Sequence, residues 1–225
     1  MSIFYKELLI FDKVLKTARK IKFENGVNII TSKLNSVGKT SLSLMLLYSF
    51  GAKVKFSDKW NLDNIFTKLT IVQNGNEIVI IRYRDTYTIE TAKERFFYPL
   101  LKSGYSEKLY ELLGLTIKIK DKDSDTYSTA VPSLYLLPYF LSQTKTDDDR
   151  SIFLDLQMYS KSDLHDALYY HVGALDNEYS GVIQELTKNK AALERFKKDK
   201  EKQLEEIKYL EAKLEENKNL KVTDT

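Results

Sequence analysis

The 225 residues can bury one substantial core, since 43% of them are hydrophobic, and they leave length for an appendage. The absence of cysteine excludes disulfides and cysteine-ligated zinc or iron–sulfur sites, and it suits a reducing compartment. The N-terminus lacks the order of a secretory signal, and the longest apolar run falls far short of the ~20 residues of a membrane-spanning helix. We therefore expect a cytoplasmic protein without membrane contact.

The formal net charge is only +3, but the first 60 residues are strongly basic. They contain eleven Lys or Arg, at positions 6, 13, 16, 19, 20, 22, 33, 39, 53, 55 and 59, against four acids at 7, 12, 24 and 58. A basic region of this kind suits a polyanion such as a nucleotide or DNA. Lysines that are simply exposed to solvent explain it equally well.

In chain order, β-rich segments lead to a phosphate-binding motif. Residues 6–12 (KELLIFD) and 19–30 (RKIKFENGVNII) have the composition of strands. Residues 36–41 (SVGKTS) are typical of a Walker A loop, and residues 40–50 are apolar enough for a helix buried against a sheet. Strand, loop and helix thus follow one another in the order that phosphate binding requires.

The Walker A motif, G-x-x-x-x-G-K-[ST], departs from its usual form at one position. Gly38, Lys39 and Thr40 supply its last three residues, but Lys33 takes the place of the first glycine. A lysine fits there if its backbone φ is negative, because the first glycine serves a tight turn. The alternative is a Gly-Lys-Thr that occurs by chance before a buried helix.

The middle of the chain predicts a hairpin followed by helical segments. Asn74-Gly75 separates two alternating β-rich runs within residues 66–90, which is a strong hairpin signal. Residues 91–114 have helical composition with a break at Gly104. Residues 116–129 read as a strand that runs into an acidic loop.

An aromatic run follows, and it ends at Ser142-Gln143. Prolines at 132 and 138 argue against one uninterrupted helix in this run. Residues 161–172 predict a helix with Ser162 as its N-cap candidate.

Other candidate sites have simpler explanations. The acids at 147–149 can bind a divalent ion or form a solvated turn. His165 and His171 lack further ligands at the spacing of a zinc site.

From residue 177 onward the composition is that of a long helix, with one glycine, no proline and many Lys and Glu. Alternating steps of four and three from Val182 give seven apolar residues in eleven positions. We call these seven the seam residues: Val182, Leu186, Leu193, Phe196, Ile207, Leu210 and Leu214. The pattern indicates a coiled coil with polar interruptions. Roughly 45 helical residues would extend nearly 70 Å at ~1.5 Å each, so the helix needs a partner.

In their order, "GVNIITSKLNSVGKTS", "LYLLPYFLSQ" and "YHVGALDNEYSGVIQELTKNK" resemble the N-terminal half of an SMC-like ATPase head. This ABC-type group includes the SMC, RecN and RecF proteins, and the likeness is greatest to coiled-coil ATPases of bacterial DNA repair and antiviral defence. The resemblance implies an α/β, P-loop NTPase fold over essentially the whole chain. Residues 1–172 would form a β-rich head lobe with flanking helices, and residues 173–225 an outgoing coiled-coil arm.

The resemblance also implies ATP and Mg²⁺ as cofactors. The nucleotide-binding residues would be Asn35, Ser36, Val37, Gly38, Lys39, Thr40 and Ser41. Lys39 and the loop amides would hold the β- and γ-phosphates, and Thr40 and Gln143 would ligate Mg²⁺. Lys39 and Gln143 would be catalytic, because Gln143 would also sense the γ-phosphate and the attacking water. The alternative for Gln143 is a polar residue at a helix end, and no aromatic residue stands out as the adenine contact.

Two parts that such a head needs do not occur in the sequence: a Walker B strand ending in Asp-Glu, and a Ser-Gly-Gly signature. Residues 8–12 (LLIFD) mimic Walker B, but they precede the loop and are followed by Lys13. Residues 152–155 (IFLD) also lack the Glu. We therefore expect the first half of a longer protein, which alone binds nucleotide weakly and hydrolyses almost none.

The expected function is that of an ATPase which engages DNA through ATP-dependent dimerisation of two heads. Its partners would be its own C-terminal half, reached through the coiled coil, a second copy, DNA and accessory subunits. DNA contacts would be mostly to phosphates and therefore salt-sensitive. The alternative is a coiled-coil interaction scaffold with a degenerate, non-hydrolysing P-loop domain, which Lys33 and the missing Walker B favour. A P-loop kinase or GTPase fits the long heptad arm poorly.

Overall fold

A computed structural model describes residues 3–34, 38–115, 117–120, 127–140, 152–174 and 177–218. The chain divides into two compact units, Met1–Asn177 and Glu178–Thr225, whereas the sequence suggested a boundary after residue 172. The first unit combines an antiparallel sheet with helices, and the second is helical. The mixed α/β class is thus confirmed. Among the described residues, no helix has both the length and the apolar composition to cross a membrane.

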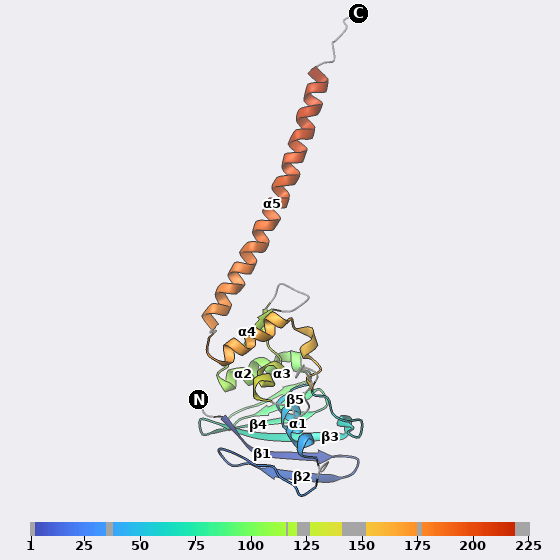
Figure 1. The fold of residues 1–225 in the computed structure, drawn as a ribbon, viewed down its shortest axis with the longest axis vertical. Helices are drawn as coiled ribbons and strands as arrows, with labels where there is room; N and C mark the ends of the chain where they lie inside the picture. The colour runs from blue at the N-terminus through green and yellow to red at the C-terminus, as the bar shows by residue number, and fades with distance from the viewer. Residues whose placement is uncertain are drawn as a thin grey trace, which may run out of the picture. The chain divides into compact units, whose positions relative to one another are not determined.

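Six strands form one antiparallel sheet in the order β2-β1-β3-β4-β5-β6 (Figure 1). They are β1 (Ile3–Asp12), β2 (Thr17–Lys22), β3 (Ile65–Gln73), β4 (Asn76–Tyr83), β5 (Thr86–Glu90) and β6 (Arg95–Tyr98). Asn74 and Gly75, with φ of 48° and 84°, connect β3 to β4, which confirms the predicted hairpin. A separate hairpin pairs β7 (Lys118–Lys120) with β8 (Tyr127–Thr129).

Two predictions of secondary structure are wrong. Residues 27–30 form no strand, and Val27 and Ile29 are 93% and 81% exposed. Their composition suits a strand, but a strand needs a neighbouring backbone, and none of the described strands pairs with this segment. Residues 95–98 are a strand and not part of a helix, because they pair with β5 at the edge of the sheet.

Along the chain, the helices of the first unit come after the six strands of the sheet, except for α1, which lies between β2 and β3. They are α1 (Lys39–Phe50), α2 (Ser106–Leu113), α3 (Pro132–Leu136) and α4 (Lys161–His171). Shorter turns are η1 (Leu62–Asn64), the π-helical η2 (Leu101–Tyr105), η3 (Leu137–Tyr139) and η5 (Leu156–Met158). Figure 1 shows α2, α3 and α4 gathered beyond the β4–β5 side of the sheet.

Local signals explain where most of these helices begin and end. Gly104, with φ 102°, interrupts the helical backbone within η2, just before α2 begins, which agrees with the predicted break. The prolines divide their run as predicted, since Pro132 begins α3 and Pro138 lies in the following 3₁₀ turn. The N-cap of α4 is Ser160 and not Ser162: its hydroxyl accepts a hydrogen bond from the Asp163 N–H.

The core lies between the sheet and the helices, and α1 packs against β3 and β4. Alternate residues of the strands face it, as the period of a β-strand requires. The fully buried apolar side chains include Leu8, Met45, Leu69, Ile71, Ile80, Ile89, Leu109 and Leu134.

The C-terminal end of α1 is fixed by contacts from distant parts of the chain. Arg82 is buried, and its Nη1 donates to the carbonyl oxygens of Tyr48 at 2.6 Å and Ala52 at 2.8 Å. Its guanidinium also lies 3.6 Å from the centre of the Tyr48 ring. The hydroxyl of Tyr105 donates to the Phe50 carbonyl at 2.8 Å. The bonds to the Tyr48 and Phe50 carbonyls satisfy groups that the end of a helix leaves unpaired.

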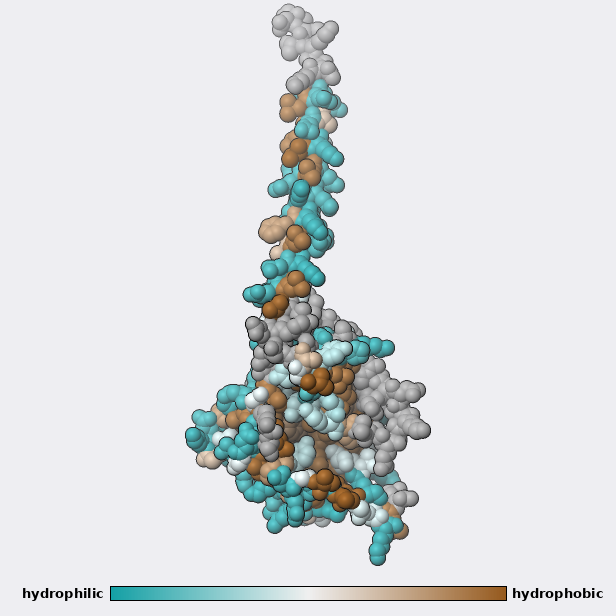
Figure 2. Space-filling view, turned by 60° about the vertical axis from the view of Figure 1, so that its left-hand side comes forward, coloured by the Kyte–Doolittle hydropathy of each residue, from teal (hydrophilic) through white to brown (hydrophobic). Residues whose placement is uncertain are grey.

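The described part of the second unit belongs to one helix, α5 (Asn177–Lys218), of 42 residues. The long helix is therefore confirmed, while its pairing in a coiled coil stays a prediction. All seven seam residues are exposed, by 46% to 71%. Figure 2 shows hydrophobic side chains recurring along one side of this helix among polar ones. Such a stripe on an otherwise charged helix is typical of a surface that packs against another helix.

Candidate nucleotide-binding site

At the N-terminal end of α1, no described group accepts a hydrogen bond from the backbone N–H groups of the first turn. Its N-cap is Gly38, which has φ 93° and no side chain to accept a hydrogen bond, and the first turn contains no acid. The first intrahelical bond runs from the Leu42 N–H to the Gly38 carbonyl at 2.9 Å. The earlier amides of the helix therefore keep their positive partial charge, which is the feature that lets a helix N-terminus bind an anion.

The side chain of Lys39 turns back over the segment that precedes the helix. Its Nζ donates to Ser32 Oγ at 2.8 Å and lies 3.5 Å from the Leu34 carbonyl oxygen. Ser32 Oγ in turn donates to that same carbonyl at 2.6 Å. Both partners of the ammonium are neutral oxygens. A charged phosphate oxygen binds an ammonium more strongly, so an incoming phosphate can replace them.

The lysine at the first position of the motif fits its backbone. The described non-glycine residues with positive φ are Lys16, Asn74 and Arg84, so Lys33 does not adopt the left-handed conformation that favours glycine. Its side chain is exposed. The substitution therefore imposes no backbone strain at this point of the loop.

The structure describes four of the predicted nucleotide-binding residues. Gly38, Lys39, Thr40 and Ser41 lie at the N-cap and in the first turn of α1. Thr40 is exposed and Ser41 is half-buried. The other predicted site residues, Asn35, Ser36, Val37 and Gln143, lie outside the described residues, so their roles stay predictions.

A cavity of about 380 Å³ adjoins the helix N-terminus. Gly38, Lys39 and Ser41 line it, and so do Arg19 from β2 and Trp60 from the segment between α1 and β3. Sequence reasoning missed both of the latter. Trp60 had a signal, because it is the only tryptophan of the chain and stands in the polar stretch "FSDKWNLD". Arg19 had none that set it apart from the neighbouring lysines.

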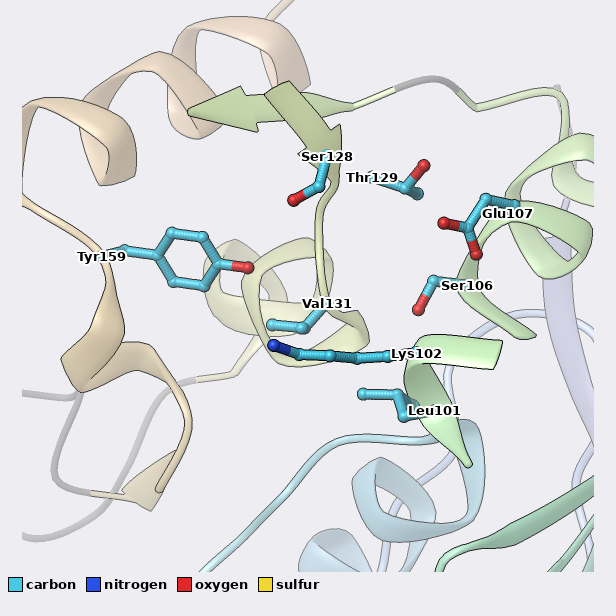
Figure 3. Close-up of a pocket in the computed structure, with 8 residues that line it drawn as sticks. All are labelled: Leu101, Lys102, Ser106, Glu107, Ser128, Thr129, Val131 and Tyr159. Atoms are coloured by element: carbon cyan, nitrogen blue, oxygen red, sulfur yellow. The ribbon is translucent and has the colours of Figure 1, made fainter. Parts of the chain in front are cut away.

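A second cavity, of about 210 Å³, lies between η2, α2 and β8. Figure 3 shows the amine of Lys102 and the hydroxyl of Tyr159 reaching into it from opposite walls, with Glu107 farther along. Hydroxyls of Ser106, Ser128 and Thr129 complete its polar lining. It contains one cation and one carboxylate, whereas the first cavity combines two cations with the N-terminus of a helix. The first cavity is therefore the better anion site.

No protein-family model matches the chain. Two curated homologues carry the name Lamassu protein LmuB. The one from Bacillus cereus (strain VD014) is 30% identical over 211 residues, which are 93% of this chain and 37% of that protein. The one from a Bacillus sp. strain is 26% identical over 156 residues, which are 68% of this chain and 27% of that protein. The chain thus spans about a third of the length of these relatives.

Proposed function

We propose that the chain is the ATP-binding half of an SMC-like ATPase of a bacterial defence system. In this proposal, ATP draws two heads together, the assembled protein engages DNA, and a C-terminal half supplies Walker B and the signature for hydrolysis. Accessory subunits belong to the same assembly. The resemblance of the sequence to coiled-coil ATPases of defence and repair supports the pathway, and the likeness to the two LmuB proteins agrees with it.

The observation that carries the proposal is the arrangement at the start of α1. The side chain of Lys39 returns over the loop to Ser32, 2.8 Å away, beside a helix N-terminus that has no side-chain cap and no acid in its first turn. Amides, helix dipole and ammonium thus favour negative charge at the same place. A triphosphate fits this combination of donors.

Each site residue of this chain would have its own role in binding the nucleotide. Gly38 leaves room for close approach of a phosphate, because no atom of the described residues lies within 4 Å of the position where a Cβ would be. Lys39 would neutralise the β- and γ-phosphates, and the Thr40 hydroxyl would ligate Mg²⁺ together with Gln143. Bound Mg²⁺ stabilises the charge of the triphosphate.

The segment before the loop has the exposed apolar side chains of a surface that another part of the protein covers. Four apolar side chains between residues 27 and 34 are 41% to 93% exposed: Val27, Ile29, Ile30 and Leu34. An apolar segment of this kind marks an interaction site on a protein surface. We propose that the C-terminal half of the ATPase covers it, and that α5 and its exposed seam lead the chain to that half.

A thermal-shift experiment with ATP and Mg²⁺ tests nucleotide binding. A ligand at 100 times its Kd stabilises the folded state by about 2.7 kcal/mol. For a chain of this size the melting temperature should rise by roughly 5–10 °C. Lys39→Ala should abolish the rise because it removes the ammonium at the phosphates.

Lys33→Ala is the matched control, since it removes the same charge from the same loop at an exposed position. It should keep most of the rise. The same experiment separates the proposal from the scaffold alternative. No shift in the wild-type protein, or an equal shift in Lys39→Ala, would favour the scaffold.

A further inference from the structure

We infer that the cavity beside Lys39 includes a base-binding subsite in which Trp60 stacks on the heterocyclic base of the nucleotide. The inference rests on the proposed function, because it takes the phosphates to lie at the N-terminus of α1. It goes further by naming the residue that holds the base, for which the Walker A motif gives no candidate.

The lining of the cavity divides by chemistry. Gly38, Lys39 and Ser32 are the phosphate-binding side, and they lie together through the bond from Lys39 Nζ to Ser32 Oγ. The rest of the lining includes Ile21 and Trp60, which offer apolar surface. A nucleotide has the same division between a charged triphosphate and a flat base with apolar faces.

The β1–β2 hairpin supplies one wall of the apolar part. Ile10 of β1 is directly opposite Arg19 of β2 in the sheet register. Ile21 lies two residues after Arg19, so both side chains point to the same face of β2. Arg19 is exposed and forms no ion pair with any described residue. Its charge is thus available to the cavity along with that of Lys39.

Trp60 is held in place for stacking. Its ring is half-buried, and it packs against Phe56 with the ring centres 5.7 Å apart. Phe56 in turn meets the ring of Tyr48 edge-on at 6.1 Å. The backbone N–H of Trp60 donates to the Ser57 carbonyl at 3.0 Å, and this bond closes the turn that carries the ring. A ring fixed by such neighbours loses little conformational entropy when a base stacks on it.

The test compares the affinities of ATP and inorganic tripolyphosphate for the full natural polypeptide, measured by calorimetry with Mg²⁺. Tripolyphosphate has the phosphates but no base. Trp60→Ala should weaken the affinity for ATP about tenfold, which is typical of a lost base–aromatic stack, and leave the affinity for tripolyphosphate unchanged. Trp60→Phe should restore most of the ATP affinity, because phenylalanine also stacks.

Unchanged tripolyphosphate affinity also shows that Trp60→Ala is folded. Equal losses for both ligands, or no loss for either, would overturn the base subsite while leaving nucleotide binding intact. If the wild-type protein binds neither ligand, or if Lys39→Ala binds both normally, the proposed function fails and the subsite with it.

Fluorescence gives a second readout of direct contact. The fluorescence emission of Trp60 is obtained by subtracting the emission of Trp60→Phe from that of the wild-type protein. Saturating ATP should quench that emission, and saturating tripolyphosphate should not. Quenching of equal size by both ligands would contradict stacking of the base on this ring.

Discussion

The two ends of α1 differ in almost every physical property. At the C-terminal end, Gly51 closes the helix and Arg82 binds its last carbonyls in a buried environment. At the N-terminal end, no described atom lies within 4 Å of the Cβ position of Gly38, and the described partners of the Lys39 ammonium are neutral oxygens. At the C-terminal end the fold supplies partners for the carbonyls of Leu47, Tyr48 and Phe50, whereas the N-terminal end keeps charge and hydrogen-bonding capacity.

The difference between the two ends of α1 means that one end contributes to the stability of the fold and the other to binding. Bonds to carbonyls at the end of a helix stabilise the fold only if they are made within the chain, so the C-terminal end needs buried partners such as Arg82. A phosphate site needs the opposite, because donors already paired with acids do not bind an anion strongly. We therefore expect substitutions at the C-terminal end to lower stability, and substitutions at the N-terminal end to alter binding.

Among the substitutions at the two ends of α1, the largest loss of stability is expected for Arg82→Ala. It removes the donors to the Tyr48 and Ala52 carbonyls and the cation that stacks on the Tyr48 ring. We expect a loss of about 3 kcal/mol in the free energy of unfolding, measured by denaturant titration. Arg95→Ala, which breaks an exposed ion pair with Glu90, should cost less than about 1 kcal/mol. Equal losses would mean that Arg82 does not anchor α1.

A smaller loss is expected for Gly51→Ala, and its control isolates the role of packing. Gly51 and Gly26 both have strongly positive φ, of 119° and 110°. A Cβ on Gly51 would lie 2.8 Å from Tyr105 Cε1, whereas nothing lies within 4 Å of the corresponding position on Gly26. Backbone strain alone costs about 1–2 kcal/mol. Thermal unfolding should show Gly51→Ala to be clearly the more destabilising, and the reverse order would contradict tight packing around this end of α1.

A pH-dependent effect is expected for Asp155, a mostly buried acid near the anchored end. Burial is the largest cause that raises its pKa above the ordinary 3.8, while the nearby Ser133 hydroxyl and the Lys53 charge oppose the shift. The hydroxyl makes no bond of normal geometry with either carboxylate oxygen, so burial prevails. The folded chain holds this proton more tightly than the unfolded chain does.

The contribution of Asp155 to stability is therefore complete below pH 3.8 and is lost as the pH rises through its folded-state pKa. Asp155→Asn removes that loss, so its melting temperature relative to wild type should increase from acid to neutral pH. Melting curves of both proteins across this range check the sign. A relative melting temperature that falls towards neutral pH would show that the carboxylate is stabilised by partners.

The smallest effect is expected for Ile29→Ala in the exposed apolar segment. The side chain of Ile29 is 81% exposed, so its truncation should change the free energy of unfolding of this chain by less than about 0.5 kcal/mol. Ile71→Ala, at a fully buried site, should cost about 2–5 kcal/mol in the same assay. A loss at Ile29 close to that at Ile71 would show that the segment is already covered within this chain.

The sequence predicted the features that depend on local chemistry. Asn74-Gly75 specifies its hairpin, and the prolines at 132 and 138 interrupt their run, because a few adjacent residues decide the backbone there. The long charged helix from Asn177 also followed from composition and period. The place of Gly38 and Lys39 at the start of α1 was predicted for the same reason, since both belong to a local motif, while their binding of phosphate stays a prediction.

The features that were missed depend on contacts between distant residues. Residues 27–30 have strand composition but find no strand to pair with, and residues 95–98 become a strand because β5 is available. Arg82 bonds to the end of α1, and Trp60 lines a cavity together with residues of the β1–β2 hairpin, and both neighbours lie more than 30 residues away in the sequence. No local pattern encodes these neighbours.

The most direct measurement of the central claim is a structure of the full natural polypeptide with Mg²⁺ and a non-hydrolysable ATP analogue at saturating concentration. We predict that the β- and γ-phosphates lie against the first amides of α1 and that Lys39 Nζ has left Ser32 to bind them. A structure with the analogue bound elsewhere, and with the bond from Lys39 to Ser32 intact, would contradict the proposed phosphate site.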